Sequence, residues 1–211
     1  MKEDMQIVLI SDRKALAGEA LWTALASAAG AGLTAFMLRE KDLPGRALLA
    51  LARETVARCR PMGIRVLVND RVDVALAAGA DGVHLGGDAI PADAARRIAG
   101  GRLGIGVSTH SIEEIRAAAL AGADYAIFGP VFETPSKMQY GAPQGVENLR
   151  RAVAAGPLAV IAVGGIGPDN AAQLRGTGIA GIAVIRAILG ASDPAAVVRD
   201  LRSALAPREM P

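Results

Sequence analysis

Short apolar runs alternate along the chain with longer segments in which apolar residues recur at helical spacing. The runs carry Val, Ile and Leu at successive positions, which indicates strands that are buried on both faces. The pattern predicts eight strands, at 6–11, 33–38, 64–69, 81–85, 103–108, 124–129, 158–163 and 179–184. It predicts helices near 14–29, 45–60, 71–78, 91–99, 112–121, 145–155, 168–175 and 194–205. Strand and helix therefore alternate along the sequence.

This alternation predicts an α/β fold class. Buried strands that are joined through helices form a parallel sheet covered by helices, and eight such units indicate a closed (β/α)8 TIM barrel. We expect a single barrel domain over residues 1–211. The alternative is an open, doubly wound sheet, but no G-x-G-x-x-G motif follows the first predicted strand. In a barrel, reactive side chains come from the carboxyl ends of the strands and the loops that follow them.

Composition and charge narrow the possible partners. The chain has 211 residues, 52% hydrophobic and 21% charged, enough to bury one substantial core. The net charge is only +2 and no run of Lys or Arg stands out, so we expect neither a nucleic acid nor a membrane surface as partner. The single cysteine, Cys59, excludes an internal disulfide and fits a reducing compartment. No segment has the apolar length of a membrane span or a secretory signal, and we expect a soluble, cytoplasmic protein.

Cations and hydroxyl groups follow two of the predicted strands. Arg39 and Lys41 come after the second strand, where alternation in an extended stretch places both on the same side. Thr134, Ser136 and Lys137 come after the sixth strand. An ammonium group beside two hydroxyl donors suits phosphate oxygens. A single cation at a strand end is also compatible with an ordinary solvated charge, so the prediction of an anion site depends on several of them meeting at one rim.

Three further strand ends carry residues that fit an anionic ligand. Gly164 and Gly165 follow the seventh strand and would expose backbone N–H groups to a second phosphate, although a tight turn also uses glycine. Arg186 lies near the end of the eighth strand. Asn69 and Asp70 end the third strand, and a carboxylate beside a diphosphate is a usual ligand of Mg²⁺. Asp70 has an alternative role as a favourable charge at the start of the next helix.

The two histidines leave their roles open. His84, between Val83 and Leu85, is compatible with either a core position or a place in the site. His110 precedes Ser111, the expected N-cap of the next helix, which favours a loop or capping role. The Cys and His content offers no obvious nucleophilic triad.

At this point the sequence resembles the thiamine phosphate synthase family, together with its close relative, the thiazole tautomerase. The similarity covers nearly the whole chain. The matching stretches are MLREKDL (37–43), LVNDRVDVALAAGADGVHLG (67–86), IGVSTHS (105–111), ADYAIFGPVFETPSK (123–137), AVGGI (162–166) and GIAVIRAI (181–188). The resemblance implies a transferase that joins an aminopyrimidine methyl diphosphate to a thiazole phosphate and releases diphosphate, within thiamine biosynthesis.

The resemblance also implies a role for each candidate residue. It implies that the diphosphate is held by Arg39, Lys41 and Lys137, with Asn69 beside it and Asp70 on Mg²⁺. It implies that the pocket is lined by Ser108, Thr134 and Ser136. It implies that the thiazole phosphate is received by Gly164, Gly165 and the backbone after the last strand, where Arg186 lies. The expected partners are small phosphorylated molecules, and a homo-oligomer remains open.

Four positions depart from the synthase or tautomerase pattern. Met37 stands where the synthases carry Gln, and Ala89 stands where they place a second metal carboxylate, with Asp88 next to it. Arg186 replaces a small hydroxyl residue, and Pro130 stands where the tautomerase places a histidine that carries protons. The set of cations and the TPSK stretch (134–137) favour diphosphate transfer, and the missing histidine removes the main catalyst of the tautomerase, so the sequence favours a synthase. The alternatives are a tautomerase-like isomerase and a non-catalytic regulatory protein that binds thiazole phosphate.

Overall fold

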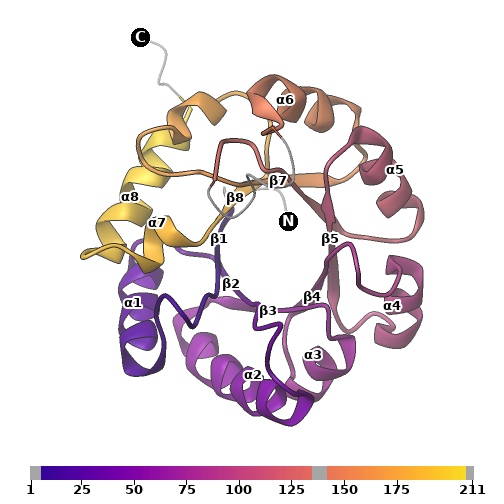
Figure 1. Ribbon diagram of the computed structural model, residues 1–211, viewed down its shortest axis with the longest axis vertical. Coiled ribbons are helices and arrows are strands. Elements are labelled where there is room, and N and C mark those ends of the chain that lie inside the picture. The colour runs from indigo at the N-terminus through magenta and orange to yellow at the C-terminus, as the bar shows by residue number, and fades with distance from the viewer. Residues whose placement is uncertain (1–5, 135–141, 208–211) are drawn as a thin grey trace.

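Eight parallel strands form a closed barrel in which each strand is hydrogen-bonded to the next in chain order (Figure 1). The computed structural model describes residues 6–134 and 142–207. The strands are β1 (Gln6–Ile10), β2 (Ala35–Leu38), β3 (Arg65–Asn69), β4 (Gly82–Leu85), β5 (Gly104–Thr109), β6 (Tyr125–Phe128), β7 (Ala159–Val163) and β8 (Gly181–Val184). β8 pairs with β1, which closes the sheet. The predicted α/β class and (β/α)8 TIM barrel are confirmed.

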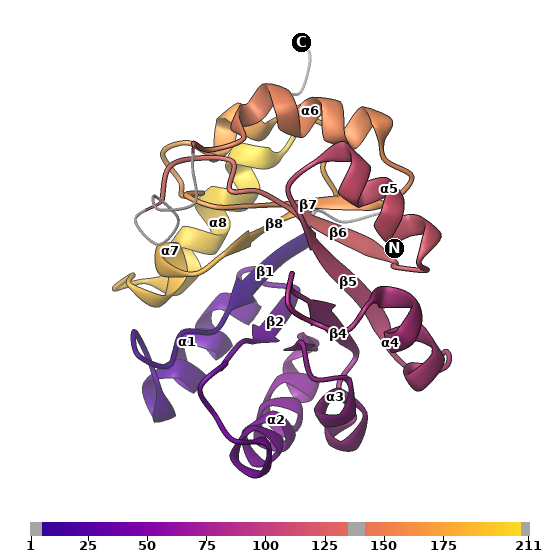
Figure 2. The ribbon, with the colours of Figure 1, turned by 45° about the vertical axis from the view of Figure 1, so that its right-hand side comes forward.

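The helices surround this barrel, as Figures 1 and 2 show from two directions. The α-helices are α1 (Gly18–Gly30), α2 (Gly45–Cys59), α3 (Val72–Ala78), α4 (Ala92–Ala99), α5 (Ile112–Leu120), α6 (Gly145–Ala155), α7 (Arg186–Leu189) and α8 (Pro194–Leu205). The described ranges also contain the short 3-10 helices η1 (Arg60–Met62) and η3 (Ala171–Leu174). Each strand except β7 and β8 is thus followed by one α-helix before the next strand, within the described ranges.

The segment between β7 and β8 differs from the prediction. A helix over 168–175 is wrong, because only the short η3 forms there. The side chain of Asn170 donates to the carbonyl of Gly165 at 2.7 Å and accepts from the N–H of Gly167 at 2.9 Å. These local bonds hold the chain in a turn and compete with helical hydrogen bonding. The four-residue α7 after β8 has no counterpart in the predicted helices.

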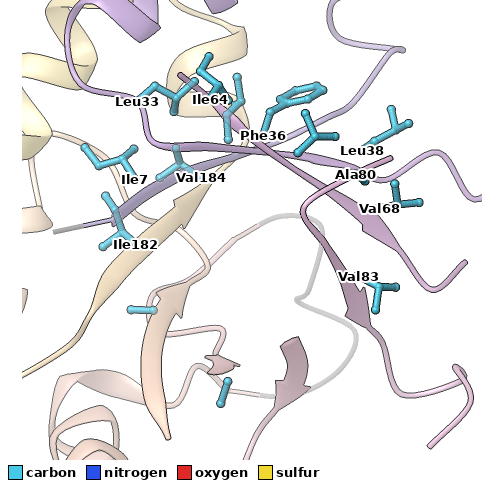
Figure 3. Packing of buried hydrophobic residues seen from close by; sticks show 14 of the residues in the cluster. Ile7, Leu33, Phe36, Leu38, Ile64, Val68, Ala80, Val83, Ile182 and Val184 are labelled. Carbon is cyan, nitrogen blue, oxygen red and sulfur yellow. The ribbon is translucent and has the colours of Figure 1, made fainter. Parts of the chain in front are cut away.

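Alternate residues along the strands pack into two apolar layers. One set points outward to the helices, as Ile7, Phe36, Val68 and Ile182 do in Figure 3. The other set fills the barrel interior and includes Val8, Ile10, Ala35, Met37, Tyr125, Ile127, Ile161 and Ala183. Both faces of the strands are therefore buried, which explains why apolar residues occupy successive positions in the sequence.

The single cysteine lies in the outer layer. Cys59 ends α2 and is fully buried. Burial raises the pKa of its thiol to about 12, and the charge of Asp81 adds to this effect. A thiol with so high a pKa is a weak nucleophile at neutral pH. We therefore assign Cys59 a packing role.

No helix within the described ranges is long and apolar enough to cross a membrane.

Candidate active site

Chemically active side chains gather where β2, β3, β4 and β5 end. These strands are neighbours, with Asn69 of β3 opposite His84 of β4, and His84 opposite Gly106 of β5. Because the strands are parallel, their carboxyl ends lie at one end of the barrel. The structure thereby brings together residues that are far apart in the sequence, among them Lys41, Asn69, Asp70, His84 and Ser108.

A pocket of about 200 Å³ lies beside the ends of β2 and β3. Its lining is Glu40, Lys41, Leu43, Leu48, Asn69, Asp70 and Arg71. Lys41 Nζ is 3.4 Å from Asp70 Oδ2, and Asp70 Oδ1 accepts the N–H of Gly86 at 2.7 Å. Lys41, Asn69 and Asp70, three of the predicted site residues, therefore share one pocket.

A larger hollow of about 620 Å³ lies at the amino-terminal ends of the strands. Its lining includes Gln6 and Arg65, the first residues of β1 and β3. It is shallow and opens widely to solvent. Barrel enzymes have their active sites at the carboxyl ends of the strands, which is where the Lys41–Asp70 pair lies. We therefore assign the site to the smaller pocket.

Asp70 has an unusual backbone conformation that directs its carboxylate. Its φ is +62°, in the left-handed region that residues other than glycine seldom adopt, although Asp tolerates it better than most. The Asp70 N–H donates to the carbonyl of His84 at 2.8 Å. Together with the Gly86 contact, this bond ties Asp70 to the end of β4. Backbone outliers of this kind occur often at functional sites.

The loop after β2 is anchored by a buried carboxylate that the sequence analysis did not single out. Glu40 is 8% exposed and lies between the exposed Arg39 and Lys41. Ser11 Oγ donates to Glu40 Oε1 at 2.6 Å, and the N–H of Arg13 donates to the same oxygen at 3.2 Å. Ser11 Oγ in turn accepts the N–H of Arg39 at 2.8 Å. Glu40 is therefore buried, whereas its two cationic neighbours are exposed to solvent.

His84 points into the barrel and meets Ser108. Its Nε2 is 2.9 Å from Ser108 Oγ, and its ring stacks on Tyr125 with the centroids 5.9 Å apart. A Cβ on Gly106 would overlap the Tyr125 ring, so glycine is required there for the tyrosine to fit. Burial lowers the pKa of His84 to about 4. The negative charge of Asp70 partly opposes this shift, and the positive charge of Arg39 adds a smaller lowering. His84 therefore occupies a buried position, and its contact with Ser108 leaves a role in the site as a prediction.

This histidine makes stability depend on pH. As the pH falls from about 6.5 to about 4, the unfolded chain protonates His84 while the folded chain keeps it neutral. The unfolded state then binds more protons, so the free energy of unfolding decreases as the pH falls through this window. Above about pH 6.5 the full contribution of the neutral histidine to stability is present. The effect is expected to reach about 3 kcal/mol. Urea unfolding at several pH values measures it.

Two variants isolate this contribution from that of the carboxylates. His84→Phe should remove this part of the pH dependence, whereas His110→Gln, which changes the exposed histidine, should retain it. The same slope in all three proteins would contradict the prediction.

Gly164 and Gly165 form a close contact with the loop after β6. Both have positive φ, +101° and +64°. The N–H of Val131 donates to Val163, at the end of β7, at 2.8 Å, and that of Phe132 donates to Gly164 at 3.0 Å. A Cβ on Gly165 would overlap the carbonyl of Glu133. The tight-turn role of the glycine pair is therefore supported by its geometry, and its phosphate-binding role stays a prediction.

The remaining predicted residues are placed as follows. Thr134 is half-buried in the segment between β6 and α6, and Arg186 is exposed as the first residue of α7. Ser136 and Lys137 lie outside the described residues. Ser111 is the N-cap of α5 and accepts from the N–H of Glu114, as expected for the segment that follows His110.

The fit of Mg²⁺ depends on a single carboxylate. In the part of the chain that the structure describes, no group of three or more His, Cys, Asp or Glu residues could hold a metal ion. Ala89 closes a turn by donating its N–H to Gly86 at 3.1 Å, and Asp88 beside it is exposed. Mg²⁺ commonly uses one or two carboxylates and completes its shell with water and substrate phosphates. Asp70 alone therefore fits a magnesium ion that arrives with a diphosphate.

Comparisons with known proteins identify the family. A family model described as thiamine monophosphate synthase matches residues 7–188. A putative thiamine-phosphate synthase of Geobacter sulfurreducens is 45% identical over 98% of this chain and 97% of its own. A thiamine-phosphate synthase of Roseiflexus castenholzii is 43% identical over 96% of this chain and 89% of its own.

Solved structures give the same result. Thiamine phosphate pyrophosphorylase from Pyrococcus furiosus superposes with a TM-score of 0.86 at 36% identity, and 95% of each chain is covered. A 3-hexulose-6-phosphate synthase from Salmonella typhimurium has a TM-score of 0.74 at 18% identity, covering 95% of this chain and 98% of its own, which is a likeness of fold alone.

Proposed function

Because the chain belongs to the thiamine monophosphate synthase family, we propose that its site joins an aminopyrimidine methyl group to a thiazole phosphate and releases diphosphate. Membership makes the protein a transferase. The observation that supports a working site is the pocket in which Lys41, Asn69 and Asp70 meet at the carboxyl ends of β2 and β3. A cation, an amide and a carboxylate at one barrel mouth suit a diphosphate and its counter-ion.

The proposed mechanism is charge separation that is stabilised by fixed cations. As the bond to the diphosphate breaks, negative charge accumulates on the leaving group while the pyrimidine methylene becomes cationic. Arg39, Lys41 and Lys137 would stabilise the leaving group, because preorganised charges act most strongly where charge develops. The thiazole nitrogen then attacks the methylene carbon. No protein nucleophile takes part.

Asp70 is the proposed magnesium ligand. When bound, magnesium supplies positive charge to the departing diphosphate. Lys41 neutralises the Asp70 carboxylate in the structure, and we propose that its ammonium group turns to the diphosphate when substrate binds. Asn69, which is 8% exposed, would donate its amide N–H beside them.

The thiazole phosphate is assigned to the opposite part of the barrel mouth. Ser108, Thr134 and Ser136 would line the space between the two substrates. Gly164 and Gly165, with the backbone after β8, would receive the phosphate, and Arg186 would contribute a charge there. Phosphate binding by backbone N–H groups at the last two strand ends is common in barrel enzymes.

A tautomerase-like activity is the second candidate, and a binding protein without catalysis is the third. Pro130, which follows Gly129 directly after β6, cannot carry protons, which counts against the tautomerase. Ala89 and the buried Met37 are the features that favour a binding protein, because they remove polar groups that the synthases possess.

The test is to incubate the purified protein with both phosphorylated precursors and Mg²⁺. Release of diphosphate with formation of thiamine phosphate supports the synthase. Conversion of the thiazole between tautomers without release of diphosphate supports the isomerase. Tight binding of thiazole phosphate with neither reaction supports the binding protein. Omitting Mg²⁺ tests the metal requirement.

Lys137→Ala is expected to lower turnover at least about tenfold, because it removes charge stabilisation of the leaving group. The measurement is diphosphate release under saturating substrates, with the wild type in parallel. Lys14→Ala, in the loop after β1 on a lysine that has no assigned role, is the matched control. Turnover at the wild-type rate in Lys137→Ala would remove Lys137 from the mechanism.

A further inference from the structure

His84 and Ser108 form a buried polar pair inside the barrel. The two residues lie on the neighbouring strands β4 and β5, and His84 Nε2 is 2.9 Å from Ser108 Oγ. His84 is 4% exposed, whereas Ser108 is only half-buried. The serine hydroxyl is therefore the member of the pair that a bound ligand can reach.

The distance between His84 Nε2 and Ser108 Oγ does not say which atom is the donor. The surroundings of the other ring nitrogen, Nδ1, identify it. His84 Nδ1 is buried and has no hydrogen-bond partner among the described residues. A neutral imidazole carries one N–H, and a buried N–H without an acceptor is costly and rare, while an unfilled acceptor is tolerated more often. The proton therefore belongs on Nε2, where Ser108 Oγ accepts it.

We propose that His84 is a positioning residue that donates its Nε2–H to Ser108 Oγ and thereby commits Ser108 to donate its own proton to a ring nitrogen of the aminopyrimidine. This inference rests on the proposed function. A serine hydroxyl has one proton and accepts through its lone pairs. With His84 donating, the hydroxyl proton is directed away from the histidine and toward the ligand.

This polarity selects between the two kinds of group that an aminopyrimidine presents. A ring nitrogen is an acceptor and matches a donating Ser108, whereas the exocyclic amine offers N–H donors. Without the histidine, the hydroxyl can rotate and serve either. His84 would thus set which edge of the pyrimidine faces β5, and so the direction of the methylene carbon at which the reaction occurs. A site built around a directed hydrogen bond rejects analogues that lack the matching atom.

The first test reads the tautomer of His84 directly and needs no substrate. The chain has only two histidines, His84 and His110, so long-range ¹H–¹⁵N correlation spectra of the labelled protein can be assigned with His84→Phe. We expect the Nε2–H tautomer for His84. A proton on Nδ1 would overturn the proposal, whatever the protein catalyses.

The second test measures selectivity against two pyridine analogues of the pyrimidine diphosphate, each with one ring nitrogen replaced by C–H. The wild type is expected to discriminate against one of them about tenfold in kcat/KM, the size of one lost hydrogen bond. His84→Phe and Ser108→Ala should lose this discrimination. His84→Gln, whose amide places an N–H near the Nε2 position, should restore it.

A merely structural role of His84 predicts a different result, since a loosened site would slow the substrate and both analogues alike and leave the ratio unchanged. That outcome in His84→Phe overturns the proposal. Thr109→Val is the matched control, because the Thr109 hydroxyl next to Ser108 donates to the carbonyl of Ile127 at 3.3 Å and lies in the buried wall. The ratio of kcat/KM values for the two analogues in Thr109→Val should equal that of the wild type.

Absence of any coupled product from the wild type would count against the proposed function. The tautomer measurement then decides the inference about His84.

Discussion

Asp70→Asn is expected to lower magnesium-dependent turnover at least about 100-fold, because it removes the single carboxylate proposed to hold the metal. Asn keeps the shape of the side chain and tolerates the left-handed backbone at φ +62°, so the fold should persist. Lys41 loses the charge that lies 3.4 Å from its ammonium group. Diphosphate release as a function of Mg²⁺ concentration, with thermal unfolding of the same variant, separates a metal effect from a folding effect.

The control for this variant is Asp93→Asn. Asp93 lies at the start of α4, is exposed and pairs with Arg97 at 2.6 Å. This substitution also removes one carboxylate from a cationic partner, but away from the pocket, and it should leave turnover within about twofold because exposed ion pairs contribute little. If Asp70→Asn retains a third or more of wild-type turnover at saturating Mg²⁺, Asp70 is not the metal ligand.

Gly165→Ala is expected to lower the free energy of unfolding by about 4 kcal/mol, combining a left-handed backbone penalty with overpacking. The added Cβ would overlap the carbonyl of Glu133 and lie 2.9 Å from Phe132 Cβ. The loop after β6 must then move away from β7, and it carries Thr134 into the proposed site. Turnover should therefore fall together with stability. Urea unfolding and the coupling assay measure the two effects.

Two other glycines separate the causes. Gly176 also has a positive φ, +72°, but a Cβ there would have open space, so Gly176→Ala reports the backbone penalty alone. At Gly101 a Cβ would also have open space and φ is not positive, so Gly101→Ala should change stability little. Destabilisation of Gly165→Ala no larger than that of Gly176→Ala would show that the contact with the β6 loop is not tight.

The sequence predicted the barrel well because its signal is local and repeated. Strands buried on both faces have to be apolar at successive positions, and this pattern located every strand to within about two residues. The segment around η3 failed for an equally local reason. Asn170 bonds to Gly165 and Gly167, and apolar spacing does not report a side chain that replaces helical hydrogen bonds.

The site was predictable only in part. Strand ends identified Lys41, Asn69 and Asp70, because parallel strands place their carboxyl ends together. Glu40 was missed, since its role depends on the loop after β1 reaching it through Ser11. The two roles of His84 could not be separated from sequence either, because the choice depends on which face of β4 it occupies and on what β5 places opposite.

The hydrogen bonds around Glu40 couple the conformations of the loops after β1 and β2. Ser11 joins the Glu40 carboxylate to the Arg39 backbone, so neither loop can change its course alone without stranding a buried charge. Anyone who grafts a new specificity onto this barrel, or shuffles its first two strand–helix units with those of another enzyme, should therefore transplant Ser11 and Glu40 as a pair.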